Sequence, residues 1–158
     1  MLMSACAGLV SAPRYTDAPQ AEVVRELAAR RWADRKRLLR VANSYRGVPY
    51  LWGGTTRAGM DCSALARAIF RETYGIELPR TVRQMYALGQ SIQSDKALRA
   101  GDLVFFRDTF SGPGVSHVGV YLGDGVFAHA SATLGGTLTP LSDAYFACRF
   151  AGGRRIRR

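Results

Sequence analysis

The sequence predicts an α+β fold in which N-terminal helices pack on a central antiparallel β-sheet. The first half of the chain carries apolar residues at helical spacing, over about residues 21–46 and from residue 62 to about 75. The second half carries short apolar or alternating runs separated by glycine-rich turns, which is typical of strands. Helices that precede a set of hairpin-linked strands favour a layer of helices on an antiparallel sheet.

Length and composition indicate one ordinary globular domain with a sizeable core. The chain has 158 residues, of which 47% are hydrophobic and 22% charged. Its formal net charge of +10 favours an acidic partner such as nucleic acid, anionic lipid or bacterial cell wall. The alternative is a preference for arginine on a solvated surface. Because the chain shows no helix-turn-helix, RNP-type or zinc-finger pattern, we expect no nucleic-acid partner.

The first 20 residues are interpreted as a lipoprotein-like N-terminus and linker. Ser-Ala-Cys-Ala-Gly around Cys6 resembles the end of a bacterial lipoprotein signal, although no basic and apolar region precedes it in this sequence. Lipidation of Cys6 would anchor the protein to a membrane, with the outer membrane as the expected site. The stretch 9–19 contains Pro13 and Pro19 and reads as a linker.

Residues 21–46 form the first predicted helix, or two helices broken near Asp34. This is the most basic part of the chain, with Arg30, Arg31 and four further basic residues up to Arg40. Such a run is usually a solvated face, and the alternative is contact with anionic wall or lipid headgroups.

Cys62 is the principal candidate for a catalytic residue in this sequence. Apolar residues after it recur at helical spacing and Gly75 follows, so a helix should begin at Cys62 and end near Gly75. A cysteine in the first turn of a helix faces unpaired N–H groups and the positive end of the dipole, which favour a reactive thiolate. The alternative is a small buried core residue. Gly53, Gly54 and Gly59 favour the reactive interpretation, because a packing cysteine does not require close backbone approach.

The next elements are a short helix over about 81–88, a turn at 100–102 and a buried strand at 103–106. A flexible loop at 108–114 borders a cleft in this interpretation. Thr81 or a neighbouring residue caps the short helix.

The two histidines lie on a predicted hairpin. Residues 116–122 and 126–130 are β-like runs joined by Gly-Asp-Gly. A three-residue loop pairs Leu122 with Val126 and places His117 and His129 on one face, with room for imidazole beside Gly119. A two-residue loop would place them on opposite faces. A cysteine with two such histidines is the set that a thiol enzyme needs, with His117 as base and His129 orienting it.

The remaining runs, 137–141 and 145–157, are predicted as closing strands. Cys148 lies among aromatic residues and is predicted to pack in the core. Three cysteines so widely spaced do not suggest a disulfide framework or a metal motif.

Six motifs in this order resemble the NlpC family of papain-like cell-wall peptidases. They cover about residues 38–155 and read Pro-Tyr-Leu-Trp-Gly-Gly from Pro49, Asp-Cys-Ser from Asp61, Leu-Pro-Arg-Thr from Leu78, Gly-Asp-Leu-Val-Phe-Phe from Gly101, Ser-His-Val-Gly-Val-Tyr-Leu-Gly from Ser116, and Phe-Ala-His-Ala from Phe127. Ala64 departs from the family's usual glycine and could narrow the cleft.

The resemblance implies a papain-like catalytic domain over 21–158 in which Cys62 is the nucleophile, His117 the base and His129 the orienting residue. It further implies substrate binding by Tyr50 near the scissile carbonyl, and a subsite for a stem-peptide amine at Asp61, Ser63 and Ser116. The expected activity is hydrolysis of amide bonds in peptidoglycan stem peptides or cross-links, in the periplasm, with no cofactor.

Two rival functions remain at this point. Cys62, His117 and His129 are chemically possible zinc ligands with an open fourth position, although their spacing is dispersed. The same fold could also serve a non-catalytic wall-binding protein, and the cysteine and histidine set argues against that.

Overall fold

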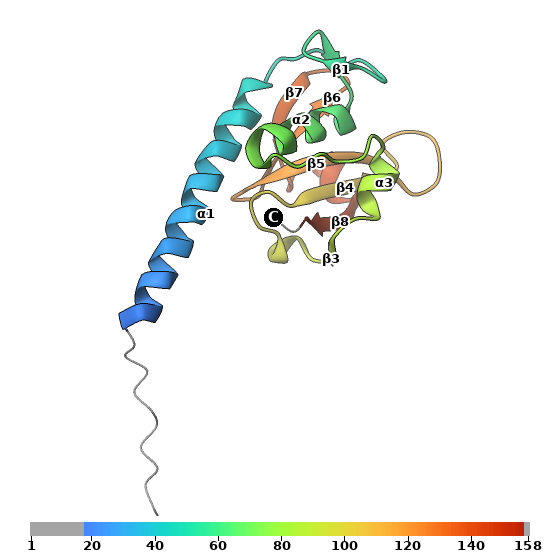
Figure 1. Ribbon diagram of the computed structural model, residues 1–158. Helices are drawn as coiled ribbons and strands as arrows, with labels where there is room; N and C mark the ends of the chain where they lie inside the picture. The colour runs from blue at the N-terminus through green and yellow to red at the C-terminus, as the bar shows by residue number, and fades with distance from the viewer. Residues whose placement is uncertain (1–17, 157–158) are drawn as a thin grey trace, which may run out of the picture.

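The computed structural model describes residues 18–156, which form a six-stranded antiparallel sheet with the longer helices on one face (Figure 1). The strand order is β3-β8-β4-β5-β6-β7. The strands are β3 Gln90–Ile92, β4 Leu103–Arg107, β5 Val115–Gly123, β6 Val126–Ser131, β7 Gly135–Pro140 and β8 Phe150–Arg155. A separate two-stranded sheet, β1 Thr55–Thr56 with β2 Gly59–Met60, precedes the second helix.

The first helix, α1 Ala18–Ser44, is continuous, so the break considered near Asp34 does not occur. Its last turns carry Leu38, Val41 and Ala42 into the core. The preceding residues are mostly exposed, and this half of α1 extends beyond the rest of the domain (Figure 1). Among the described residues, no helix has the length and apolar character needed to cross a bilayer.

The other helices are α2 Cys62–Tyr74, α3 Val82–Tyr86, a 3₁₀ turn Asp95–Ala97 and α4 Ala144–Ala147. The start of α2 at Cys62 is as predicted, and Gly75 at φ 70° ends it in the left-handed conformation. Thr81 is confirmed as the cap of α3, where it forms a capping box with Gln84.

The sheet has a different apolar core on each face. On one face, Val118, Val120 and Leu122 of β5 pack with buried residues of α1 and α2. On the other, Tyr121 packs with Phe106 and Phe127. Successive side chains of a strand alternate between faces, so His117 lies with this second group, with its ring 6.2 Å from that of Phe106 and 5.8 Å from that of Phe146.

The β5–β6 hairpin has the predicted register but a different loop. Gly123 pairs with Val126, which leaves a two-residue turn, and not the predicted loop of three residues. A bulge between Tyr121 and Gly123 then shifts the register, so that Tyr121 pairs with Phe127. The bulge therefore keeps both histidines on one face, which a regular two-residue hairpin would not do.

Two predictions for the end of the chain are wrong. Residues 144–147 form a helical turn, not a strand, because the Asp143 carboxylate caps it by accepting a hydrogen bond from the Tyr145 N–H at 2.9 Å. This turn places Cys148 at the surface, so the predicted core packing of Cys148 is wrong. Its Sγ lies 3.3 Å from the Ala144 carbonyl oxygen and 3.2 Å from Arg149 Nη1.

Candidate active site

Cys62 is buried at the first turn of α2, with only 5% of the residue exposed. Burial raises the pKa of its thiol to about 11, and the Asp61 charge adds to this. The backbone N–H groups of Val118, Ser63 and Cys62 donate toward the sulfur and act in the opposite direction. The thiol is therefore protonated at neutral pH, because burial outweighs the helix-start effect that the sequence suggested.

The two histidines form a buried hydrogen-bonded chain. His117 Nε2 lies 2.9 Å from His129 Nδ1, and His129 Nε2 lies 2.9 Å from Thr139 Oγ1. Burial lowers the pKa of His117 to about 3, with a further contribution from His129, and burial lowers the pKa of His129 to about 4. Both rings are neutral at pH 7.

Close packing fixes the histidine rings. The Phe127 ring stacks on His129 with centroids 4.8 Å apart. The sequence analysis expected the space beside Gly119 to hold an imidazole. The Phe127 ring fills this space instead, since a Cβ at Gly119 would lie 2.5 Å from Phe127 Cδ2. Thr139 was missed in the sequence analysis. Its position two residues from Thr137, which pairs with His129 on β7, was the signal that could have found it.

The nucleophile helix and the histidine strand meet at the start of β5. Val118, whose N–H donates toward the Cys62 sulfur, follows His117 directly in the chain. Cys62 and Val118 also belong to the same buried apolar cluster, so Cys62 packs against the strand that carries His117.

Asp61 and Ser63 form a compact polar cluster with Arg80, which the sequence analysis did not single out. Arg80 Nη2 donates to Asp61 Oδ2 at 2.6 Å, and Arg80 Nη1 donates to Asp61 Oδ1 at 3.1 Å and to Ser63 Oγ at 2.6 Å. Burial acts to raise the pKa of Asp61, but the bonds from Arg80, Ala64 and Ser63 lower it overall. The signal for Arg80 was its place in the Leu-Pro-Arg-Thr motif.

Tyr50 and Ser116 differ in how their hydroxyls are used. The Tyr50 hydroxyl is buried without a hydrogen-bond partner among the described residues. Burial raises the pKa of Tyr50 to about 12, and the charges of Cys62 and Asp61 contribute. Tyr50 forms an isolated β-bridge with Met60, two residues before Cys62. Ser116 Oγ instead lies 2.7 Å from Thr109 Oγ1 and accepts from the Thr109 N–H at 3.0 Å, so it connects the 108–114 loop to β5.

Ala64, the residue that departs from the family's usual glycine, is 4% exposed and packs in the core.

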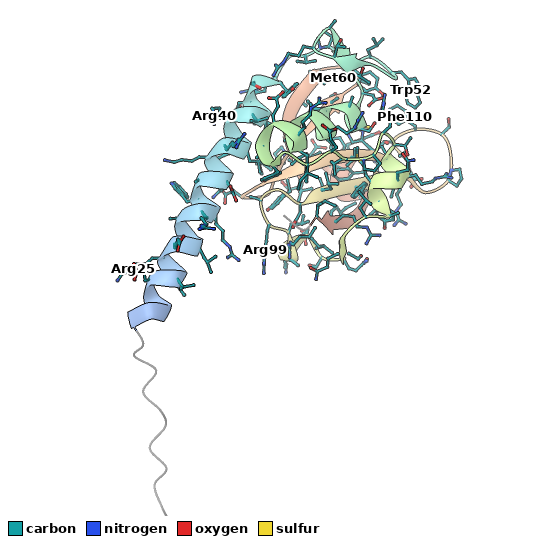
Figure 2. All side chains as sticks on the ribbon, viewed as in Figure 1. Arg25, Arg40, Trp52, Met60, Arg99 and Phe110 are labelled. Carbon is teal, nitrogen blue, oxygen red and sulfur yellow. The ribbon has the colours of Figure 1, made fainter. Side chains whose placement is uncertain are left out.

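A pocket of about 350 Å³ opens beside the two imidazoles, and no charged side chain lines it. Its wall is made by Thr109, Phe110, His117, His129, Ala130, Ser131, Ala132, Thr133, Tyr145 and Phe146. Near it, Trp52 and Phe110 lie together (Figure 2), with ring centroids 5.3 Å apart. This contact joins the segment before Cys62 to the loop before His117.

The zinc alternative finds no support in the geometry. His129 has both ring nitrogens engaged, one with His117 and the other with Thr139, so it has none directed at a metal shared with Cys62. Within residues 18–156, no three His, Cys, Asp or Glu side chains are grouped closely enough to hold a metal ion. Cys6 lies outside the described residues.

Comparison with known proteins agrees with the order of the motifs. The NlpC/P60 family profile matches residues 47–155. The chain belongs to the NlpC/P60 family. It has the papain-like α+β fold that the resemblance implied: the structure of an NlpC/P60 family protein from Bacillus cereus superposes with a TM-score of 0.69 at 31% identity, over 77% of this chain and 40% of that one.

Two curated relatives of this NlpC/P60 chain carry names that state an activity. The probable endopeptidase NlpC homolog of Haemophilus influenzae is 43% identical over 121 residues, 77% of this chain and 62% of that protein. The murein DD-endopeptidase MepS/murein LD-carboxypeptidase of Escherichia coli is 39% identical over 112 residues, 71% of this chain and 57% of that protein. The chain thus spans about three fifths of these relatives.

Proposed function

We propose that this protein is a cysteine peptidase that hydrolyses amide bonds in peptidoglycan stem peptides or their cross-links. The observation that carries the proposal is the buried chain from His117 through His129 to Thr139. It starts on β5, whose Val118 packs in the same buried cluster as Cys62. The printed names of the murein-cleaving relatives supply the substrate class.

The two hydrogen bonds allow two sets of tautomers, and only one of them leaves His117 Nδ1 free to act as a base. If His129 Nε2–H donates to Thr139 Oγ1, then His129 Nδ1 accepts from His117 Nε2–H. His117 Nδ1 then carries a lone pair and is the nitrogen left for the thiol proton. His129 acts as a positioning residue, because it holds the tautomer in which His117 is a base.

The reaction proceeds in two steps. Since Cys62 and His117 are both neutral at rest, His117 takes the thiol proton as the sulfur attacks the carbonyl carbon. His117 then passes this proton to the leaving amine as the C–N bond breaks, and a thioester to Cys62 remains. Water then attacks the thioester carbonyl as His117 takes its proton. The C–S bond breaks, the free acid leaves, and His117 returns the proton to the Cys62 sulfur.

The oxyanion requires a donor that is free in the resting protein. Tyr50 meets this requirement, because its buried hydroxyl has no partner among the described residues and its backbone pairs with Met60, two residues before Cys62. The backbone N–H of Cys62 faces its own sulfur in the resting protein and is the second expected donor once the substrate is bound. In this assignment Tyr50 donates only when substrate is bound.

We further propose that the protein acts in the cell envelope, in the periplasm, and that lipidated Cys6 anchors it to the outer membrane. The lipoprotein-like residues around Cys6 and the cell-wall activity of the named relatives support this.

Digestion of purified peptidoglycan, with the released muropeptides read by mass spectrometry, tests the function. Wild-type protein should release fragments that differ by hydrolysed amide bonds, and their masses identify the bond. Cys62→Ala should abolish release, while Cys148→Ala, a matched change at the surface cysteine, should leave it intact. Full digestion by Cys62→Ala would refute the cysteine mechanism. Binding to the wall without release by the wild type would instead indicate a non-catalytic wall-binding protein.

A further inference from the structure

We propose that Arg80 is a positioning residue for the nucleophile, which clamps the Asp61 carboxylate, fixes the first turn of α2 and balances the negative charge beside the Cys62 sulfur. The inference rests on the proposed function, because it assigns a role relative to the attacking thiol. It concerns a side chain that touches neither the histidines nor Thr139.

The geometry of the clamp is bidentate and connects two segments that are distant in the chain. Both guanidinium Nη atoms of Arg80 contact Asp61, at 2.6 and 3.1 Å. Asp61 Oδ1 also accepts from the Ser63 hydroxyl and from the Ala64 N–H, each at 2.8 Å, and the latter bond caps α2. One carboxylate thus joins the Arg80 segment to the turn that begins with Cys62. The fork of arginine suits this arrangement, whereas the single ammonium of lysine does not.

The clamp also changes the electrostatics at the sulfur. Asp61 precedes Cys62 directly, and its negative charge disfavours the thiolate. Arg80 supplies the opposite charge next to the carboxylate, and it interacts with Cys62 as well. Without Arg80, the thiolate would form beside an unbalanced carboxylate. With Arg80 in place, Asp61 can cap α2 while its charge has little effect on formation of the Cys62 thiolate.

The same contacts affect the predicted amine subsite. Asp61 Oδ1 accepts three hydrogen bonds and Oδ2 accepts the shorter bond from Arg80. A substrate ammonium would have to displace the guanidinium to reach this carboxylate. We therefore assign Asp61 to the support of Cys62, and not to the binding of a free stem-peptide amine.

The test is the pH dependence of Cys62 alkylation by iodoacetamide in the full chain. The reaction is read by mass spectrometry on the tryptic peptide 58–67, which contains only this cysteine. Arg80→Gln should move the profile alkaline by about one pH unit and slow alkylation about tenfold at pH 8. Arg83→Gln, a matched change at an exposed arginine of α3, should leave the profile unchanged. The double variant Asp61→Asn/Arg80→Gln should return to the wild-type profile, because it has neither charge and asparagine still caps a helix.

A wild-type profile in Arg80→Gln would overturn the proposal, and so would a double variant that stays shifted. Should Arg80→Gln fail to fold, Arg80→Lys keeps the charge without the fork: it should leave the alkylation profile near that of the wild type while lowering kcat, and an alkaline shift would refute the electrostatic part. Alkylation needs no substrate, so it can be measured even if the protein digests no peptidoglycan. In that case the predicted shifts would still support the role of Arg80, and only the proposed function would be refuted.

Discussion

Lowering the pH from 8 to 5 should destabilise the protein through its two buried histidines. The pKa of His117 is about 3 and that of His129 about 4 in the folded chain, whereas an unfolded histidine titrates near 6.5. Because both folded pKa values are lowered, protons bind first to the unfolded chain as the pH falls. The associated stability is fully present above about pH 6.5 and is lost progressively as the pH falls toward the folded values.

The size of this loss follows from proton linkage. At pH 5 an unfolded histidine is almost fully protonated and the folded ones are almost neutral, so each costs about 2 kcal/mol and the pair about 4 kcal/mol relative to pH 8. The Asp61 pKa is lowered, so this carboxylate titrates below the window and does not contribute to it.

Urea denaturation followed by circular dichroism at half-unit pH steps measures this loss. His129→Gln provides the control, since one titrating group remains and the pH dependence should be about half as steep. A free energy of unfolding that is flat between pH 8 and 5, or an equal slope in His129→Gln, would show that burial does not hold these rings neutral.

Three substitutions test other parts of the site. Tyr50→Phe should lower kcat about tenfold or more without lowering the melting temperature, because the lost hydroxyl is buried and unpaired; a loss of stability with unchanged kcat would contradict this. Thr139→Val should reduce kcat more than Thr139→Ser, which keeps the hydroxyl facing His129, and equal rates for the two in a muropeptide assay would remove Thr139 from the positioning chain. Gly119→Ala should cost about 1–3 kcal/mol in urea denaturation through its clash with Phe127, and an unchanged midpoint would contradict that packing.

The local elements of the site could be predicted because their signals are local. The helix at Cys62 was predicted from apolar spacing and from Gly75, and in the structure Asp61 caps its start and Gly75 ends it. The histidine pair was predicted from the period of a strand. Its register held although the loop was wrong, because a bulge at Tyr121–Gly123 makes up the residue that the shorter turn removes.

The parts that could not be predicted are either very short or depend on tertiary contacts. The helical turn before Cys148 is too short to show a period, and it depends on one capping bond from Asp143. Arg80 reaches Asp61 across 19 residues of sequence, a pairing that no spacing rule gives. The raised pKa of Cys62 follows from burial beneath the completed fold, which the local helix dipole does not reveal.

The most direct test of the central claim is to look for the acyl-enzyme on Cys62. Wild-type protein is mixed with cross-linked muropeptides, quenched in acid within seconds, and analysed by intact mass and by peptic mapping. We predict added mass equal to the acyl fragment on the peptide that holds Cys62, in the wild type and in Cys148→Ala, and no added mass in Cys62→Ala. Product formation by Cys62→Ala at the wild-type rate, with Cys62 unmodified in the wild type, would contradict the account.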